Sequence, residues 1–139
     1  MRKFFSRENR ESGASIVEMA LIAPFLIILA MGVVDLSRAL YTDITINEAA
    51  QEGAIFASFE VRTAAEVRQQ IINSVHNPDL SGADTVITYS CPSGPQEPDE
   101  FTITVTHTYP LITPVGAWFG GSIDLNTEID GEIFLGHCP

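Results

Sequence analysis

The sequence predicts an α+β fold in which a long N-terminal transmembrane helix continues into a small outer domain with a short helix and an antiparallel sheet of about three strands. An apolar stretch of membrane length near the N-terminus, uncharged except for Glu18, predicts the spanning helix. Strict alternation of apolar and polar residues in the second half of the chain predicts the sheet. We expect a basic leader at 1–13, a transmembrane helix at 14–34, a continuing helix at 35–60 and an outer α+β domain at 61–139.

The apolar stretch is long enough to cross a bilayer. Met19 to Val34 contains no charged or hydrogen-bonding side chain, and extension back to Ala14 adds only Ser15 and Glu18 as interruptions. A helix over 14–34 would be about 32 Å long, close to the ~30 Å hydrocarbon core of a membrane. Pro24 lies mid-span, where a membrane helix tolerates proline with a kink.

The charges are unevenly distributed along the chain, whose formal net charge is −11. Four of the seven basic residues lie within the first ten positions, whereas every acidic residue except Glu8 and Glu11 follows Ala14. An acidic body repels phosphate backbones, so we expect no nucleic-acid partner. Because basic residues favour the cytoplasmic end of a span, we expect a cytoplasmic N-terminus, with the residues after the span outside.

A stripe of small and apolar residues continues beyond the span, from Leu36 to Phe59. Its members recur at spacings of seven, four, three and four residues, which is the pattern of one helix face. Small side chains on such a face let another element approach closely, either the protein's own outer domain or another subunit. The stripe consists of Ala39, Ile46, Ala50, Gly53 and Ala57.

Further elements follow this helix. Thr63, with Glu66 three residues later, has the spacing of a capping box and predicts a second helix over 63–75. Strands are predicted at 84–90, 101–109 and 123–135, and their alternation indicates antiparallel strands with one solvated face. The predicted apolar face comprises Phe101, Ile103, Val105, His107 and Tyr109 in one strand, and Ile123, Leu125, Thr127, Ile129, Ile133 and Leu135 in the other.

The two cysteines, Cys91 and Cys138, both follow the span and therefore lie on the oxidising side. Two cysteines in such a compartment most often pair, so we expect a disulfide. Closure of a 48-residue loop would stabilise the fold by about 4 kcal/mol in the chain-entropy model. Metal binding by Cys138 and the adjacent His137 is the weaker interpretation, because neighbouring residues rarely reach one tetrahedral ion together.

No pattern in the chain indicates catalysis. The sequence lacks a nucleophile elbow, a zinc-protease motif and a phosphate-binding loop. The acidic pattern Asp124, Asn126, Glu128, Asp130 resembles a calcium loop only faintly, since Ile129 stands where that loop requires glycine. We expect no enzyme activity, no cofactor and no metal.

Glu18 leaves three interpretations of the N-terminus open. A secretory signal peptide has basic and apolar regions, but its apolar region is shorter and carries no acid. A plain membrane anchor would hold Glu18 near the interface, where an acid costs less than at mid-bilayer. In the third interpretation, the acid has a function in assembly, and this interpretation depends on a resemblance.

The sequence "GASIVEMALIAPFLIILAMGVVDLSRALY", followed by "INEAAQEGAIFAS", resembles the TadE-like pseudopilins of the tight-adherence (Tad/Flp) pilus system, which are type IV prepilin relatives. The features that carry the likeness are the Gly-Ala-x-x-Val-Glu run, the mid-span proline, Asp35-x-x-Arg38-Ala-Leu and an Ala-rich block around Gly53. The C-terminal "ITVTHTYPLITPVGAWFGGSIDLNTEIDGE" has the character of that family's end.

The resemblance implies a minor pilin or pseudopilin that is cleaved after Gly13 by a prepilin peptidase. The cut would free an α-amino group at Ala14, with which Glu18 of the same or a neighbouring chain could pair. Implied partners are other pilin-like subunits and the pilus assembly platform. The implied location is the bacterial inner membrane, with the C-terminal domain in the periplasm or, within a pilus, outside the cell. The alternative is an uncleaved single-span protein whose outer domain binds a partner or ligand.

Overall fold

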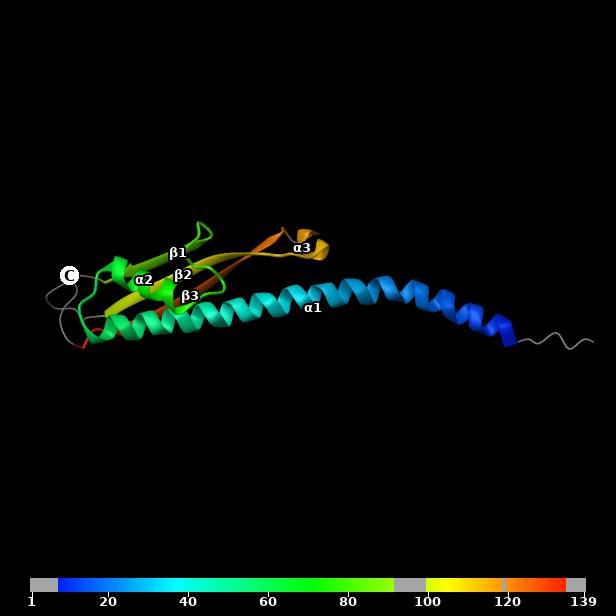
Figure 1. Cartoon of the computed structure of the whole chain (residues 1–139), viewed down its shortest axis with the longest axis horizontal. Coiled ribbons are helices and arrows are strands. Elements are labelled where there is room, and N and C mark those ends of the chain that lie inside the picture. Colours follow the sequence, from blue (N-terminus) through cyan, green and yellow to red (C-terminus); the bar gives the residue numbers. More distant parts are fainter. Residues whose placement is uncertain (1–7, 92–99, 119, 135–139) are drawn as a thin grey trace, which may run out of the picture.

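The computed structural model of the chain describes residues 8–91, 100–118 and 120–134, with side chains described from residue 13 onward. It has the predicted α+β architecture, with a long N-terminal helix, a short helix and a three-stranded antiparallel sheet (Figure 1). The elements are α1 (Glu8–Phe59), α2 (Ala64–Ser74), β1 (Thr85–Ser90), β2 (Glu100–Pro110), α3 (Pro114–Trp118) and β3 (Ser122–Glu132).

The sheet and α2 lie along the C-terminal half of α1, and the N-terminal half of α1 projects beyond them (Figure 1). The strand order is β1-β2-β3, with β2 in the centre and antiparallel to both neighbours. In the described part of the chain one helix, α1, is long and apolar enough to cross a membrane, and its most apolar stretch of 18 residues is 0% buried. The fold therefore leaves the predicted span uncovered.

The small-residue stripe of α1 packs against the protein's own outer domain. Ile46, Ala50 and Ala57 are each 0% exposed and belong to the hydrophobic core. Gly53 lies where α2 crosses closest, since a Cβ built there would be 2.4 Å from Cγ1 of Ile71. The sequence leaves open whether the stripe contacts the protein's own outer domain or another subunit, and the structure shows the contact with the protein's own domain.

The second helix has the cap that the sequence predicts. The Thr63 hydroxyl accepts a hydrogen bond from the Glu66 backbone N–H at 3.3 Å, and the Glu66 carboxylate accepts one from the Thr63 N–H at 2.9 Å. The Thr63 hydroxyl also donates to the Glu66 carboxylate at 2.9 Å, and the two bonds that this carboxylate accepts lower the pKa of Glu66, with the bond from the Thr63 backbone as the largest cause. The helix is one residue shorter at each end than expected, because Thr63 and Val75 have extended backbones and serve as caps. Its inner face buries Val67 and Ile71.

The central strand has the predicted faces. Phe101, Ile103, Val105, His107 and Tyr109 are all buried. The opposite face is solvated and carries cross-strand hydrogen bonds, in which the threonine hydroxyls of β2 donate to acceptors on β3. These are Thr102 to Asp130 at 2.8 Å, Thr106 to Asn126 at 3.0 Å and Thr108 to Asp124 at 2.7 Å.

The connection between β2 and β3 contains the short helix α3, an element that the sequence pattern does not predict. Proline at the first position of α3 suits a helix start, because its fixed φ is already helical and it has no N–H to satisfy. After α3, Gly120 and Gly121 have φ of +102° and +78°, a left-handed backbone that reverses the chain into β3. The third strand ends at Glu132 rather than residue 135, and Leu135 lies outside the described residues.

Candidate functional site

The residues predicted for processing lie far from the outer domain on the projecting part of α1. Gly13 and Ala14 are helical and exposed, and a Cβ built on Gly13 would meet no atom within 4 Å. Glu18 lies one turn further along and is also exposed. The one ion pair among the described side chains joins Arg62 to Glu60, so within that part of the chain Glu18 has no cationic partner.

The span itself presents apolar side chains on every side. Phe25 is 73% exposed, and most of the span's other large apolar residues are between 41% and 69% exposed. Such a surface is stable in lipid or against other apolar helices, and not in water. The exposed apolar residues of this segment include Ile16, Val17, Met19, Leu21, Leu26, Ile27 and Leu29.

Asp35, the first residue after the predicted span, anchors the α3 connection to α1. Its side chain is buried, at 5% exposed. One carboxylate oxygen accepts the Ile112 N–H at 3.3 Å, and the other accepts the Thr113 N–H at 3.3 Å together with the Thr113 hydroxyl. A buried carboxylate is costly unless such donors satisfy it, so these bonds hold the loop in place as well as satisfying the charge.

The same donors set the ionisation of Asp35. The Thr113 hydroxyl bond is the largest of the causes that lower the pKa of Asp35, followed by the two backbone N–H bonds and the nearby charge of Arg38, while desolvation opposes them. Gly116 permits the close approach, because a Cβ there would lie 2.4 Å from Cβ of Leu111 and 3.1 Å from Oδ2 of Asp35. Asp35 is therefore an ionised docking residue at ordinary pH.

Sequence reasoning missed this role of Asp35. The pattern after the span places Asp35 and Arg38 together, and this pair contributes only to the orientation and to the resemblance. The partners of Asp35 are 77 and 78 residues away in the chain. The sequence carries one local signal of this role. Asp35 precedes the stripe residue Ala39 by one helical turn, so this acid lies on the face of α1 that packs against the core.

The residues considered for metal binding have other roles or lie outside the described range. No group of three metal-ligating side chains is present among the described residues. Three members of the calcium-like pattern, Asp124, Asn126 and Asp130, accept the cross-strand bonds described above. His107 shares a buried hydrogen bond of 2.8 Å with the Thr85 hydroxyl, as expected for a packed histidine.

Of the two cysteines in the predicted disulfide, only Cys91 lies within the described residues. Cys91 follows β1 and packs, partly buried, against the core. Cys138 and His137 lie outside the described residues. The pairing of Cys91 with Cys138 stays a prediction.

A single uncovered apolar helix that continues into a small α+β domain is the arrangement of a membrane-anchored protein. Residues 13–54 match the family model described as TadE-like protein. No curated protein and no solved structure matches the chain. The resemblance to TadE-like proteins is thus confirmed over residues 13–54 of α1, a segment that includes Ala14, Glu18 and Asp35. The match, together with the exposed apolar helix, indicates a membrane location.

Proposed function

We propose that the protein is a minor pilin or pseudopilin of a Tad-type pilus. The observation that carries this proposal is the TadE-like match at 13–54, which includes the uncovered projecting half of α1 and continues into the half that packs against the outer domain. An apolar helix exposed over its N-terminal half is what a subunit needs in order to reside in the membrane and then pack against the helices of other pilin-like subunits.

Processing is proposed to occur between Gly13 and Ala14, on the cytoplasmic side of the span. Both residues are exposed, and a peptidase could reach them without disturbing the outer domain. They lie within helical backbone, which must open locally before it can be cut. Glycine lowers the cost of opening, because it disfavours the helix interior by about 1 kcal/mol relative to alanine.

Glu18 is proposed to act in assembly. Cleavage would give Ala14 a positive α-amino group, one helical turn from Glu18. The acid lacks a cation within the described part of the single chain, which leaves its carboxylate available to the amino group of a neighbouring subunit. An acid within an apolar helix is unfavourable unless it is paired, so this pairing would favour the assembled state.

The proposed topology follows from the charges. The basic N-terminal segment remains in the cytoplasm, and the acidic outer domain lies in the periplasm until assembly. Proposed partners are the prepilin peptidase, the pilus assembly platform and other pilin-like subunits. The consequence at the level of the cell is a contribution to pilus-dependent adhesion.

N-terminal sequencing of the native protein tests the processing step. A mature N-terminus at Ala14 supports the proposal. An intact Met1 would contradict it and favour the alternative, an uncleaved single-span protein with a partner-binding outer domain.

A variant of Glu18 tests the assembly step. Glu18→Leu should be inserted and cleaved, yet should co-purify poorly with other pilin-like subunits and support less pilus-dependent adhesion. Val17→Leu is the matched control, because it changes an adjacent exposed residue without altering charge. If Glu18→Leu is cleaved, co-purifies and supports adhesion as well as the control, Glu18 is merely an interfacial residue.

A further inference from the structure

The connection between β2 and β3 presents an uncharged apolar surface that the proposed function does not use. Residues 110–123 contain no charged side chain, although the chain as a whole has a net charge of −11. Trp118 is 77% exposed and Ile112 is 58% exposed. Exposed aromatic and aliphatic side chains in an uncharged segment are typical of a surface that contacts something apolar.

Backbone hydrogen bonds close this segment. The Leu111 N–H donates to the Gly121 carbonyl at 2.9 Å, which closes the loop at its base. The Gly121 N–H donates to the Gly116 carbonyl at 3.0 Å and ties α3 to the turn that follows. Trp118, the last residue of α3, is therefore presented by a loop that these bonds hold together.

The segment is also fixed in position relative to the span. Asp35 binds Ile112 and Thr113, and it directly follows the predicted transmembrane residues 14–34. An apolar groove of about 280 Å³ lies between α1 and the segment, lined by Gly32, Leu36, Leu111, Val115 and Ile123 among others. In Figure 1, α3 forms the end of the outer domain that faces the projecting half of α1.

These placements put α3 at the level where the span leaves the bilayer. A helix over 14–34 is about as long as the hydrocarbon core, so Asp35 falls at the outer interface. Tryptophan prefers this interface, because its ring is apolar while its N–H can reach water. We propose that α3 and Trp118 insert into the interfacial layer of the outer leaflet, giving the outer domain a second membrane contact beside α1.

The observations favour lipid over a protein as the occupant of this surface. An acidic outer domain is repelled by anionic headgroups, and the segment directed toward the span is the one without charges. The groove opens on Gly32, which belongs to the predicted span itself, so the apolar surface continues from the membrane helix onto α3. This inference rests on the proposed membrane insertion of α1.

Trp118 is the sole tryptophan of the chain, so the native protein carries its own probe. The full chain is reconstituted into phosphatidylcholine–phosphatidylglycerol vesicles that contain lipids with a nitroxide either near the headgroup or near the chain end. We expect Trp118 emission to shift to shorter wavelength and to lose more intensity with the shallow nitroxide than with the deep one. Aqueous iodide should quench it weakly.

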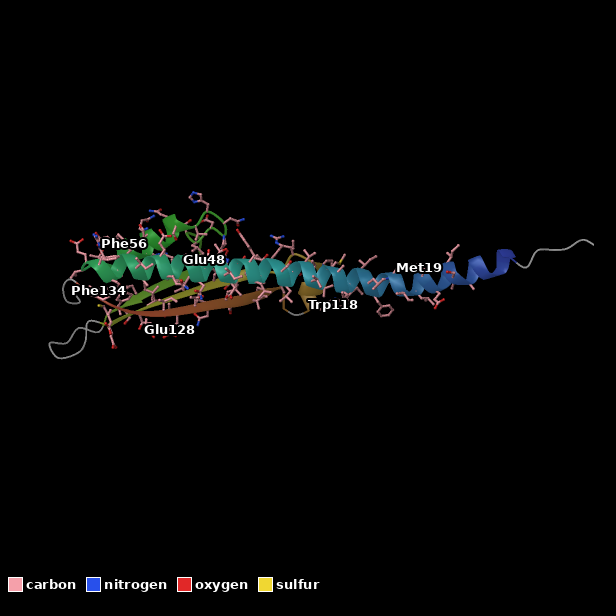
Figure 2. The ribbon with its side chains drawn as sticks, turned by 90° about the horizontal axis from the view of Figure 1, so that it is seen from below. Met19, Glu48, Phe56, Trp118, Glu128 and Phe134 are labelled. Atoms are coloured by element: carbon pink, nitrogen blue, oxygen red, sulfur yellow. The ribbon has the colours of Figure 1, made fainter. Side chains whose placement is uncertain are left out.

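Two single-tryptophan variants in a Trp118→Phe background provide matched controls. Phe25→Trp places the probe at mid-span, where the deep nitroxide should quench most. Phe134→Trp places it at the end of the outer domain remote from α3, where iodide should quench and lipid labels should not. Figure 2 shows Trp118 and Phe134 at opposite ends of the outer domain along α1. Both phenylalanines are largely exposed, at 73% and 72%, so tryptophan fits at each.

The outcomes separate this inference from the proposal on which it rests. Shallow quenching of Trp118 supports the second membrane contact. If iodide alone quenches Trp118 while the deep nitroxide quenches Phe25→Trp, the second membrane contact is overturned and the membrane insertion of α1 still stands. If Trp118 is shielded from iodide only after another pilin-like subunit is added, the surface binds protein and the lipid contact is overturned. Failure of lipid labels to quench Phe25→Trp would overturn the span and the contact together.

Discussion

The contact between α1 and α2 predicts that Gly53→Ala destabilises the outer domain, although alanine is the better helix former. In an open helix interior this replacement stabilises by about 1 kcal/mol. At Gly53 the new Cβ would lie 2.4 Å from Cγ1 of Ile71 and 2.8 Å from its Cδ1. Carbon atoms pack best at roughly 3.5–4.0 Å, so either the helices separate by about 1 Å or Ile71 leaves its rotamer.

Ile71 has little freedom to move. Its side chain is 0% exposed and packs in the core, and its branching at Cβ restricts χ1. Overpacking of a core by one methyl group typically costs about 1–3 kcal/mol. Because the gain in helix propensity offsets about 1 kcal/mol of this, we expect the free energy of unfolding to fall by about 1 kcal/mol, the middle of the remaining range.

Urea unfolding of the full chain in detergent micelles, read by pulse proteolysis of the outer domain, measures this change. Gly32→Ala is the matched control within the same helix, since a Cβ there meets no atom within 4 Å, and its midpoint should be no lower than that of the wild type. Ile71→Ala alone should cost about 2–5 kcal/mol, and the double variant should cost less than the sum, because the added methyl group occupies part of the cavity. A Gly53→Ala protein as stable as the wild type would refute the steric reasoning.

Three further predictions follow from the contacts. Asp35→Asn should reduce hydrogen-exchange protection at the Thr113 N–H, because an amide offers N–H groups where the carboxylate accepts, and equal protection in both proteins would argue against the anchor. Because folding lowers the pKa of Asp35, protection of Thr113 in the wild type should persist above about pH 4 and fall below it. Thr63→Ala should lower the free energy of unfolding by about 1 kcal/mol through loss of the α2 cap, and an unchanged urea midpoint would contradict this. Thiol alkylation of unreduced protein should label neither Cys91 nor Cys138, whereas stoichiometric labelling of both would rule out their pairing.

Most elements of the fold could be predicted because their causes are local. The apolar length of 14–34 predicts the uncovered helix, and the period-two pattern of β2 predicts which of its faces is buried. The capping box at Thr63 needs only residues three apart. The candidate processing and assembly residues also come from one short segment, 13–18, whose likeness to TadE-like proteins can be found without any tertiary contact.

The sequence by itself thus determined the class of architecture, the uncovered span and the stripe that α1 offers to a partner. Only the tertiary structure decided that this stripe packs against α2 and the sheet, that Asp35 anchors the connection between β2 and β3, and that α3 lies beside the C-terminal end of the predicted span. The physical reason is the range of the interactions. Hydropathy, periodicity and capping act over a few residues, whereas the donors that satisfy Asp35 are more than 70 residues away and approach it only when the sheet packs on α1.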